Sequence, residues 1–410
     1  MGDVKRKVTR LYIPAVGHED HQWTVDAERP YSRAERARGS GPYRSTVPLP
    51  IANYRPEFPM DLAADLDDAT HALVVFDLHA AVTLGSESPA LGPMSSVLLR
   101  TESSTSSQIE NLTAGARQLA LAELEESKSL NAKMIIANVR ALEAALRLAD
   151  QLDESSLLTM HRELLIRQRG WEEHAGVYRN QLVWVGGERS SPRGAGHIAP
   201  QNPLIKGAML DLLTFIARED LPVLAQAAIA HAQFETIHPF ADGNGRTGRS
   251  IVQAMLRGKG LITHTTAPIS AGLLRNTKSY FAALTAYRAG DAAPIIREFS
   301  SASLYAAFTG KKLVDSLAAE QESARQRLGS LRKQAVGWAV LPHLIAQPVL
   351  NTTYLQEKLG MNAMSAGRAL GQLTDAGILT EATGLSRNRV WQQSEILGIL
   401  DSYAASIRRA

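Results

Sequence analysis

The twelve residues from His238 to Arg249, HPFADGNGRTGR, carry the densest chemistry in the sequence. The run Gly243-Asn244-Gly245 predicts a tight turn, because glycine accepts backbone conformations that other residues avoid. Such a turn can aim several backbone N–H groups at one point, and the helix expected after it adds its positive end. These features together indicate a binding site for phosphate.

Four side chains around the turn extend this site. Arg246 and Arg249 are three residues apart and share a helix face, where two guanidinium groups can clamp further phosphate oxygens. Asp242 supplies a carboxylate of the kind that holds Mg²⁺ beside phosphates. His238 can act as a base near neutral pH. The pattern indicates a phosphate site with a proton acceptor next to it.

Three other phosphate signatures do not fit. Gly243, Gly245 and Gly248 match G-x-G-x-x-G, but the dinucleotide fingerprint needs a preceding strand and an acid about 20 residues later. The preceding segment LAQAAIAHAQFETI has a helical pattern, and residues 262–270 contain no acid. The kinase motifs and G-x-x-x-x-G-K-[ST] do not occur in the sequence. A turn that merely caps two helices would explain each residue singly, but not all of these roles within twelve residues.

The twelve residues match the signature H-x-F-x-[DE]-G-N-G-R-x-x-R, and the chain therefore resembles the Fic (Fic/Doc) family. The resemblance implies a mainly α fold, a Fic-type helical bundle with a small β-hairpin flap. It also implies protein AMPylation, in which AMP passes from ATP to a Ser, Thr or Tyr hydroxyl of a target protein, or of the enzyme itself, and pyrophosphate leaves.

The resemblance further implies a role for each residue of the motif. His238 would be the general base, Asp242 would position Mg²⁺, and Phe240 would be a packing anchor. The nucleotide phosphates would be held by Gly243, Asn244, Gly245, Arg246 and Arg249.

A second segment, from Ser106 to Asn111, has two interpretations. Ser107 and Glu110 form an S-x-x-E capping box, which is the ordinary start of a helix. Ser106, Glu110 and Asn111 also fit the pattern [ST]-x-x-x-E-[GN] of the inhibitory helix in many members of the family. The resemblance thus implies an inhibitory helix near residues 106–120, in which Glu110 pairs with Arg249 and removes the γ-phosphate clamp.

Two more segments are candidates for the target and nucleobase sites. The β-prone run 182–185, followed by two glycines, predicts a small hairpin. By resemblance it would be a flap that registers a target segment, although a hairpin that only packs Trp184 is an equal alternative. Asn276 and Tyr280 resemble the residues that line the nucleobase site, and Phe281 is predicted to pack in the core. His197 and His231 are expected to be satisfied polar groups.

The segment 350–391 predicts a helix, a turn, a second helix and a β-wing, and it resembles a winged helix-turn-helix module. A DNA-binding role would place Arg368 and Gln372 in a groove, with Arg387 and Arg389 on phosphates. The second helix has only one arginine and also carries Asp375, so its charge favours a structural or dimerising module. DNA binding and a homodimer both remain open.

The elements that must position these residues divide the 410-residue chain into several parts, as its length leads us to expect. We predict an extended arm over residues 1–55, a Fic domain over 56–310, a connecting helix over 311–335 and a winged helix-turn-helix domain over 336–410. Helical patterns begin at Asp61, with Leu62, Leu66, Ala69, Leu73, Val74 and Leu78 on one stripe, and recur over about 115–168, 204–218 and 221–234.

Composition limits the function classes. Hydrophobic residues make up 45% and charged residues 21%, as in globular proteins. The net charge of +3 is too small to make the whole chain a nucleic-acid binder. The lack of cysteine excludes disulfides, thiol nucleophiles and cysteine zinc sites. The first 30 residues show no secretory signal and no apolar run could span a membrane, so we expect a cytoplasmic protein.

Two other functions are compatible with the sequence. The chain could be a DNA-binding transcriptional regulator whose nucleotide site only senses ATP. It could also be a Fic enzyme that transfers another nucleotide moiety or removes AMP. The presence of His238 favours an enzyme, because sensing a nucleotide needs no base.

Overall fold

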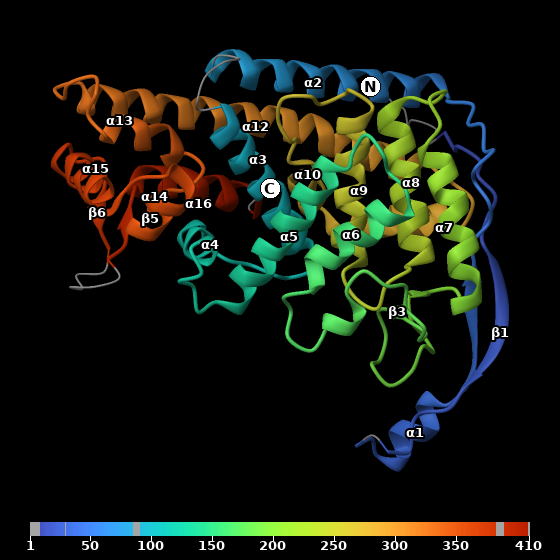
Figure 1. The fold of residues 1–410 in the computed structure, drawn as a ribbon. Helices are drawn as coiled ribbons and strands as arrows, with labels where there is room; N and C mark the ends of the chain where they lie inside the picture. Colours follow the sequence, from blue (N-terminus) through green and yellow to red (C-terminus); the bar gives the residue numbers. More distant parts are fainter. Residues whose placement is uncertain (1–8, 29, 85–90, 383–388, 409–410) are drawn as a thin grey trace, which may run out of the picture. The chain divides into compact units, whose positions relative to one another are not determined.

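The structure is a computed structural model that describes residues 9–28, 30–84, 91–382 and 389–408, and it is mainly helical (Figure 1). The chain forms two compact units. Unit 1 contains residues 1–68, 141–260 and 276–301, and unit 2 contains residues 69–140, 261–275 and 302–410. Three helices carry the chain from one unit into the other: α2 (Met60–Leu84), α5 (Leu130–Arg147) and α12 (Ala293–Leu328). No helix within the described residues is long and apolar enough to cross a membrane.

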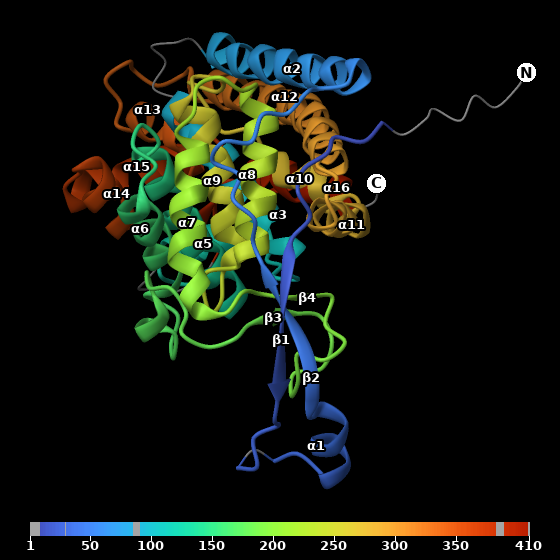
Figure 2. The ribbon, with the colours of Figure 1, turned by 90° about the vertical axis from the view of Figure 1, so that its right-hand side faces the viewer.

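Unit 1 is built around the helix α8 (Val223–Ile237), in which every residue after the first is buried. Small alanines suit this position because α8 packs against α7 (Asn202–Ile216), α9 (Asn244–Gly258) and α11 (Thr277–Arg288). Figures 1 and 2 show α7, α8 and α9 side by side. The helices predicted over 204–218 and 221–234 are therefore confirmed. The remaining helices of unit 1 are α1 (Arg33–Gly39), α6 (Glu154–Leu165) and the 3₁₀ helix η1 (Glu172–His174).

The N-terminal arm contains a regular β-ribbon that the sequence analysis missed. Strand β1 (Gly17–Trp23) pairs antiparallel with β2 (Gly41–Val47), with Gly17 opposite Val47 and Trp23 opposite Gly41. Helix α1 joins the two strands (Figure 2). The prediction of an extended arm over residues 1–55 was incomplete because polar residues occur on both faces of the ribbon, which hides the alternation expected of a half-buried strand.

The predicted hairpin is present, with a longer loop than expected. Strand β3 (Trp184–Val185) pairs antiparallel with β4 (His197–Ile198). Gly186 and Gly187 have positive φ values of 79° and 74°, but they begin an eleven-residue connection, residues 186–196, and do not form the whole turn.

In unit 2, the Ser/Thr-rich stretch before Glu110 is helical. Helix α3 (Leu91–Ile109) ends just before Glu110, and six residues, 110–115, separate it from α4 (Ala116–Glu123). The Ser107 hydroxyl donates to the Ser103 carbonyl inside α3, and Asn111 has a φ of 64°. The prediction of one continuous helix near 106–120 was therefore wrong, and so was the alternative that Ser107 and Glu110 form a capping box at a helix start. The inhibitory role of the segment remains a prediction. Serine hydroxyls can bond back to the preceding helical turn, which conceals a buried helix within a polar sequence.

Two further predictions need correction: the buried face of α2 and the start of the connecting helix. In α2, Leu62, Leu66, Ala69 and Leu73 are buried as expected, but Val74 and Leu78 are 36% and 52% exposed. The buried stripe continues instead through Phe76 and Ala80, which keep the helical spacing. Helix α12 runs without interruption over the predicted boundary at 310/311, so the connecting helix is the second half of a longer one.

The C-terminal elements occur in the predicted order. Helix α14 (Thr352–Leu359) ends at Gly360, which has a φ of 64°, and α15 (Ala363–Asp375) follows with Ala366, Ala369, Leu370 and Leu373 buried. Asn351 caps α14 by accepting from the Tyr354 N–H at 2.8 Å. Strands β5 (Val349–Leu350), β6 (Thr380–Glu381) and β7 (Trp391–Gln392) form an antiparallel sheet in the order β5-β7-β6. Unit 2 also holds α10 (Ile269–Leu274), α13 (Gly337–Val340), η2 (Leu341–Leu344) and α16 (Ser394–Arg408).

The proposed DNA-contact residues of this segment differ in their surroundings. Arg368 is exposed. The Gln372 side chain instead accepts a hydrogen bond of 2.9 Å from the backbone of Gly337, and Arg389 pairs with Glu381. Arg387 lies outside the described residues. The winged-helix assignment and DNA binding remain predictions.

Candidate active site

The residues of the phosphate motif lie on the loop from α8 to α9. Asn244 closes this loop, because its side-chain oxygen accepts from the Phe240 N–H at 2.9 Å and its amide donates to the Phe240 carbonyl at 2.8 Å. Phe240 is fully buried, as a packing anchor should be. The structure thus gives the Asn244 side chain a part in shaping the loop, in addition to the phosphate contact that the sequence predicted.

The start of α9 has the features of an anion site. Gly243 is its N-cap residue with a φ of 77°, and no side chain caps the first turn. No acidic residue occurs in that turn. Arg246 and Arg249 are both buried within α9. An uncapped helix N-terminus with cationic side chains beside it favours a bound anion such as phosphate.

His238 ends α8 in the left-handed conformation, with φ 49° and ψ 60°. This conformation costs about 1–2 kcal/mol for a residue other than glycine, and such strain is often found at functional sites. The Nδ1 atom of His238 lies 3.5 Å from Oε2 of Glu235, one turn earlier on α8. Burial by itself raises the pKa of Glu235, but the contact with His238 and the charge of Arg249 lower it to about 2. An ionised Glu235 favours a proton on Nδ1, which leaves the lone pair on Nε2.

A buried arginine holds the backbone of His238. The guanidinium of Arg179 donates to the carbonyls of His238, Gln181 and Pro200, each at 2.8 Å. Two of these carbonyls flank the flap hairpin, so Arg179 connects the strained histidine to the base of the flap. Burial lowers the pKa of Arg179 to about 10, which still leaves it charged at neutral pH.

A second histidine, His161 of α6, holds the same loop through a hydrogen bond and ring stacking. Its Nδ1 accepts from the Gly176 N–H at 3.0 Å, so its Nε2 carries the proton and donates to the Asp242 carbonyl at 3.0 Å. The His161 ring stacks on Phe240 with 3.6 Å between centroids. Burial lowers the pKa of His161 to about 4, and a neutral ring is what this pair of hydrogen bonds requires.

The sequence analysis did not identify Glu235, Arg179 or His161. Glu235 has a detectable signal, since it precedes His238 by three residues on a predicted helix. Arg179 and His161 have none, because they act on residues 59 and 81 positions away in the chain.

Asp242 is suited to one part of a magnesium site. Its carboxylate is partly exposed beside the start of α9 and accepts from Arg246 at 3.1 Å. The described residues contain no cluster of three metal-ligating side chains. A single carboxylate fits Mg²⁺, which commonly keeps water and substrate phosphates as its other ligands.

The structure revises the predicted nucleobase site. Tyr280 is only 1% exposed and forms a hydrogen bond of 2.6 Å with His231, whereas Phe281 is 48% exposed. The prediction that Phe281 packs in the core was wrong, because the buried stripe of α11 runs through residues 280, 283, 284 and 287. Asn276 caps α11 by accepting from the Ser279 N–H. In this conformation the ring of Tyr280 faces the core of unit 1.

The predicted inhibitory residues lie in unit 2, whereas Arg249 lies in unit 1. Ser106 is buried in the last turn of α3, and Glu110 and Asn111 follow directly after that helix. The pairing of Glu110 with Arg249 remains a prediction.

His197 is buried and both of its ring nitrogens have hydrogen-bond partners, as the sequence analysis expected, whereas His231 is buried with a partner for Nε2 but none for Nδ1 among the described residues. His197 donates from Nε2 to the Thr236 carbonyl at 3.0 Å, and His231 bonds to Tyr280. Burial lowers their pKa values to about 3 and about 4.

We expect acid to destabilise unit 1 through these two histidines. The unfolded chain takes up their protons near pH 6.5, whereas the folded chain does so only near pH 3–4. Stability is therefore full above pH 6.5 and falls as the pH drops toward 4, by at most about 1.4 kcal/mol per pH unit for each histidine. Urea unfolding between pH 7.5 and pH 4.5 should show a shallower slope for His197→Gln than for the wild type. Equal slopes would contradict this expectation.

Comparisons with known proteins agree with the site. The model of the Fic/DOC family matches residues 151–256, which span α6 to α9 and include the whole motif. Protein adenylyltransferase fic-1 of Caenorhabditis briggsae is 30% identical over 148 residues, which are 36% of this chain and 26% of that protein. A probable protein adenylyltransferase of Aquifex aeolicus is 30% identical over 108 residues, 26% of this chain and 29% of that protein.

The chain thus matches little more than a quarter of the length of these relatives. Among solved structures, a crystal structure of a Fic family protein from Desulfovibrio desulfuricans covers 82% of this chain and 97% of its own. Its TM-score is 0.50 at 21% identity, a likeness that shows the fold.

Proposed function

We propose that the protein transfers AMP from ATP to a hydroxyl side chain of a target protein and of itself, because residues 151–256 match the model of the Fic/DOC family. One observation carries the proposal: a base at the end of α8 and an uncapped, arginine-lined helix start at α9 are joined by a rigid six-residue loop, residues 238–243. Two relatives that match part of this chain are named a protein adenylyltransferase and a probable protein adenylyltransferase.

The phosphate chain of ATP would lie against the first turn of α9. The backbone amides of Gly243, Asn244 and Gly245 would bind the α- and β-phosphates, and Arg246 and Arg249 the β- and γ-phosphates. Group transfer at phosphorus depends mainly on positioned positive charge, which this arrangement supplies.

His238 would remove the proton from the attacking hydroxyl. The hydroxyl oxygen then forms a bond to the α-phosphorus, the bond from that phosphorus to the bridging oxygen breaks, and pyrophosphate leaves. The proton from the hydroxyl passes to Nε2 of His238, the nitrogen that Glu235 leaves unprotonated. Glu235 and Arg179 act as positioning residues, because each contacts His238 rather than the nucleotide.

Asp242 would hold Mg²⁺ beside the phosphates. When bound, the ion neutralises negative charge on the phosphate oxygens.

Labelled ATP tests the proposal directly. The protein alone, or with a cell extract, is incubated with Mg²⁺ and ATP labelled in either the α- or the γ-phosphate. We expect label on protein only from the α-phosphate. Label from the γ-phosphate would indicate a kinase, and label from neither, with the Glu110→Gly variant included, would contradict the proposal.

We also propose that Glu110 restrains this activity by pairing with Arg249. Removal of the carboxylate should leave Arg249 available to the γ-phosphate, so Glu110→Gly should raise self-modification by at least about tenfold. Glu126→Gly removes an exposed carboxylate elsewhere in unit 2 and should change nothing. A Glu110→Gly variant that is no more active than the wild type in the α-label assay would show that this carboxylate is not an inhibitor.

A further inference from the structure

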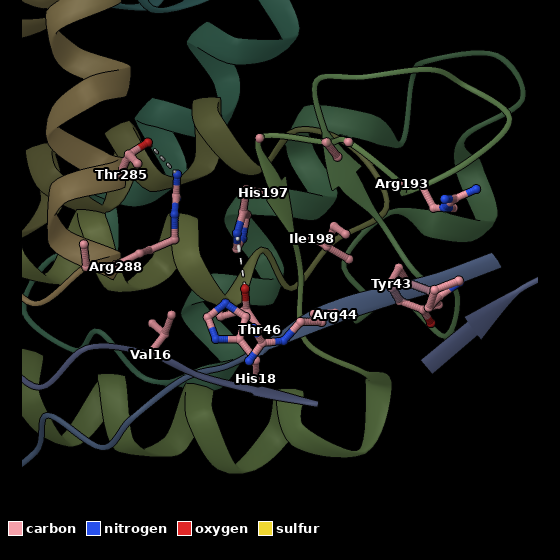
Figure 3. A pocket seen from close by; sticks show the side chains of 15 residues that line it. Val16, His18, Tyr43, Arg44, Thr46, Arg193, His197, Ile198, Thr285 and Arg288 are labelled. Atoms are coloured by element: carbon pink, nitrogen blue, oxygen red, sulfur yellow. Dashed lines mark hydrogen bonds between the residues drawn. The ribbon is translucent and has the colours of Figure 1, made fainter. Parts of the chain in front are cut away.

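A cavity of about 660 Å³ lies beside the flap in unit 1. Its walls are formed by the β1–β2 ribbon, the flap strand β4 with the glycine-rich segment before it, and the C-terminal end of α11 (Figure 3). Three arginines and two histidines line it, and among the described residues no aspartate or glutamate does. These are Arg44, Arg193 and Arg288, with His18 and His197.

Arg288 brings a half-buried charge to this cavity. Its guanidinium donates to the Thr285 hydroxyl at 3.3 Å (Figure 3). Burial lowers the pKa of Arg288, while the charge of Glu235 acts in the opposite direction. A guanidinium that has lost part of its hydration attracts an anion more strongly than one in open water.

Arg44 and Arg193 differ from Arg288 in their partners. The Nε of Arg44 lies 3.5 Å from Asp20, but the Arg44 side chain is 65% exposed. Such an exposed pair contributes about 0–1 kcal/mol, so another carboxylate can replace Asp20. Arg193 donates to the carbonyls of Arg38 and Ser40, which hold its position without neutralising its charge.

The positive groups are spread along the cavity. Figure 3 shows Arg288 and Arg193 at opposite ends, with Arg44 between them. A single compact phosphate could contact only one end. A segment with several carboxylates along its length can meet all three guanidinium groups.

The cavity shares a wall with the active site. His197 lines it, and the ring centroid of His197 lies 6.4 Å from that of His238. His197 is held by the Thr236 carbonyl and lies 3.5 Å from the Thr46 hydroxyl, so this wall is fixed. A chain seated in the cavity therefore passes close to the base that activates the acceptor hydroxyl.

We propose that this cavity binds an acidic segment of the target protein next to the hydroxyl that is modified. This inference rests on the proposed function and adds a preference for carboxylates flanking the acceptor.

Direct binding tests the inference without catalysis. A fluorescein-labelled peptide of sequence EEETEEE and its neutral counterpart QQQTQQQ are titrated with the full chain, and anisotropy is measured. ADP and Mg²⁺ are present in excess so that nucleotide fills the phosphate loop. We expect only the acidic peptide to bind, and the double variant Arg44→Gln/Arg288→Gln to weaken it by at least about tenfold.

The matched control is Arg167→Gln/Arg169→Gln, which removes the same charge from two exposed arginines of unit 1 outside the cavity. It should change the affinity less than about twofold. Because Arg288 is half-buried, Arg44→Glu, on the exposed ribbon, is a second test that leaves the core unchanged, and it should also weaken binding.

Three results would overturn the inference: equal binding of both peptides, equal weakening by both double variants, or loss of the bound peptide to millimolar inorganic phosphate, which would indicate a small-anion site. The α-label assay is independent of these measurements. Self-modification without peptide binding would support the proposed function and contradict the binding of an acidic segment. Peptide binding without label transfer would support the binding of an acidic segment and contradict the proposed function.

Discussion

Replacing His238 with asparagine should lower the rate of the proposed AMP transfer by about 10²- to 10⁴-fold, the usual contribution of a general base. His238 is the only histidine of the loop from α8 to α9, residues 238–243, and histidine is the most common general base in enzymes. Asparagine is the preferred replacement because it tolerates the left-handed backbone that this position requires. The measurement is the initial rate of α-label incorporation, made in the Glu110→Gly background so that a large decrease can be seen.

The same experiment includes two controls. His71→Asn changes an exposed histidine outside the site and should leave the rate unaltered. The nucleotide affinity of His238→Asn should stay within about twofold of the parent. Its free energy of unfolding in urea should stay within about 1 kcal/mol of the parent. A variant that keeps more than a tenth of the parent rate would mean that His238 is not the base.

Replacing Gly243 with valine should lower the transfer rate by about 10²-fold through geometry alone. Gly243 has a φ of 77°, and a Cβ atom there would lie 2.7 Å from the Leu164 Cδ2. Leu164 is buried and cannot move aside without disturbing its neighbours. The loop must therefore shift, and a displacement of about 1 Å at reacting groups can cost about 10²-fold.

The variant Gly260→Val is a control that strains the backbone without a steric clash such as the one that Gly243→Val would cause with Leu164. Gly260 also has a positive φ, 72°, but a Cβ there would meet nothing within 4 Å. Both variants should lose stability from the strained backbone, by about 1 kcal/mol or more. Only Gly243→Val should lose activity, and the double variant Gly243→Val/Leu164→Ala should recover part of it. Equal activities of the two single variants would show that the position of this loop does not limit transfer.

The exposed and buried sides of α11 show where sequence reasoning fails. Tyr280 and Phe281 are adjacent aromatic residues, and the prediction that Phe281 packs in the core was wrong, because Tyr280 occupies the buried position. Composition could not decide between them, because either ring can fill a core position. The partner that decides is His231, 49 residues earlier in the chain.

What the sequence by itself determined is the chemistry whose parts lie within one short segment. The motif from His238 to Arg249 could be identified because a base, a turn and two arginines on one helix face are set by local spacing. The helices α7, α8 and α9 followed from periodicity for the same reason.

Only the tertiary structure decided what supports that motif. His161 and Arg179 fix the loop through backbone carbonyls, and any residue type supplies a carbonyl, so no spacing in the sequence announces the contact. The β-ribbon and the basic cavity beside the flap likewise bring together residues 18, 44, 193 and 288. Residues this far apart in the sequence come together only because of how the helices and strands pack. Local sequence patterns do not predict that packing.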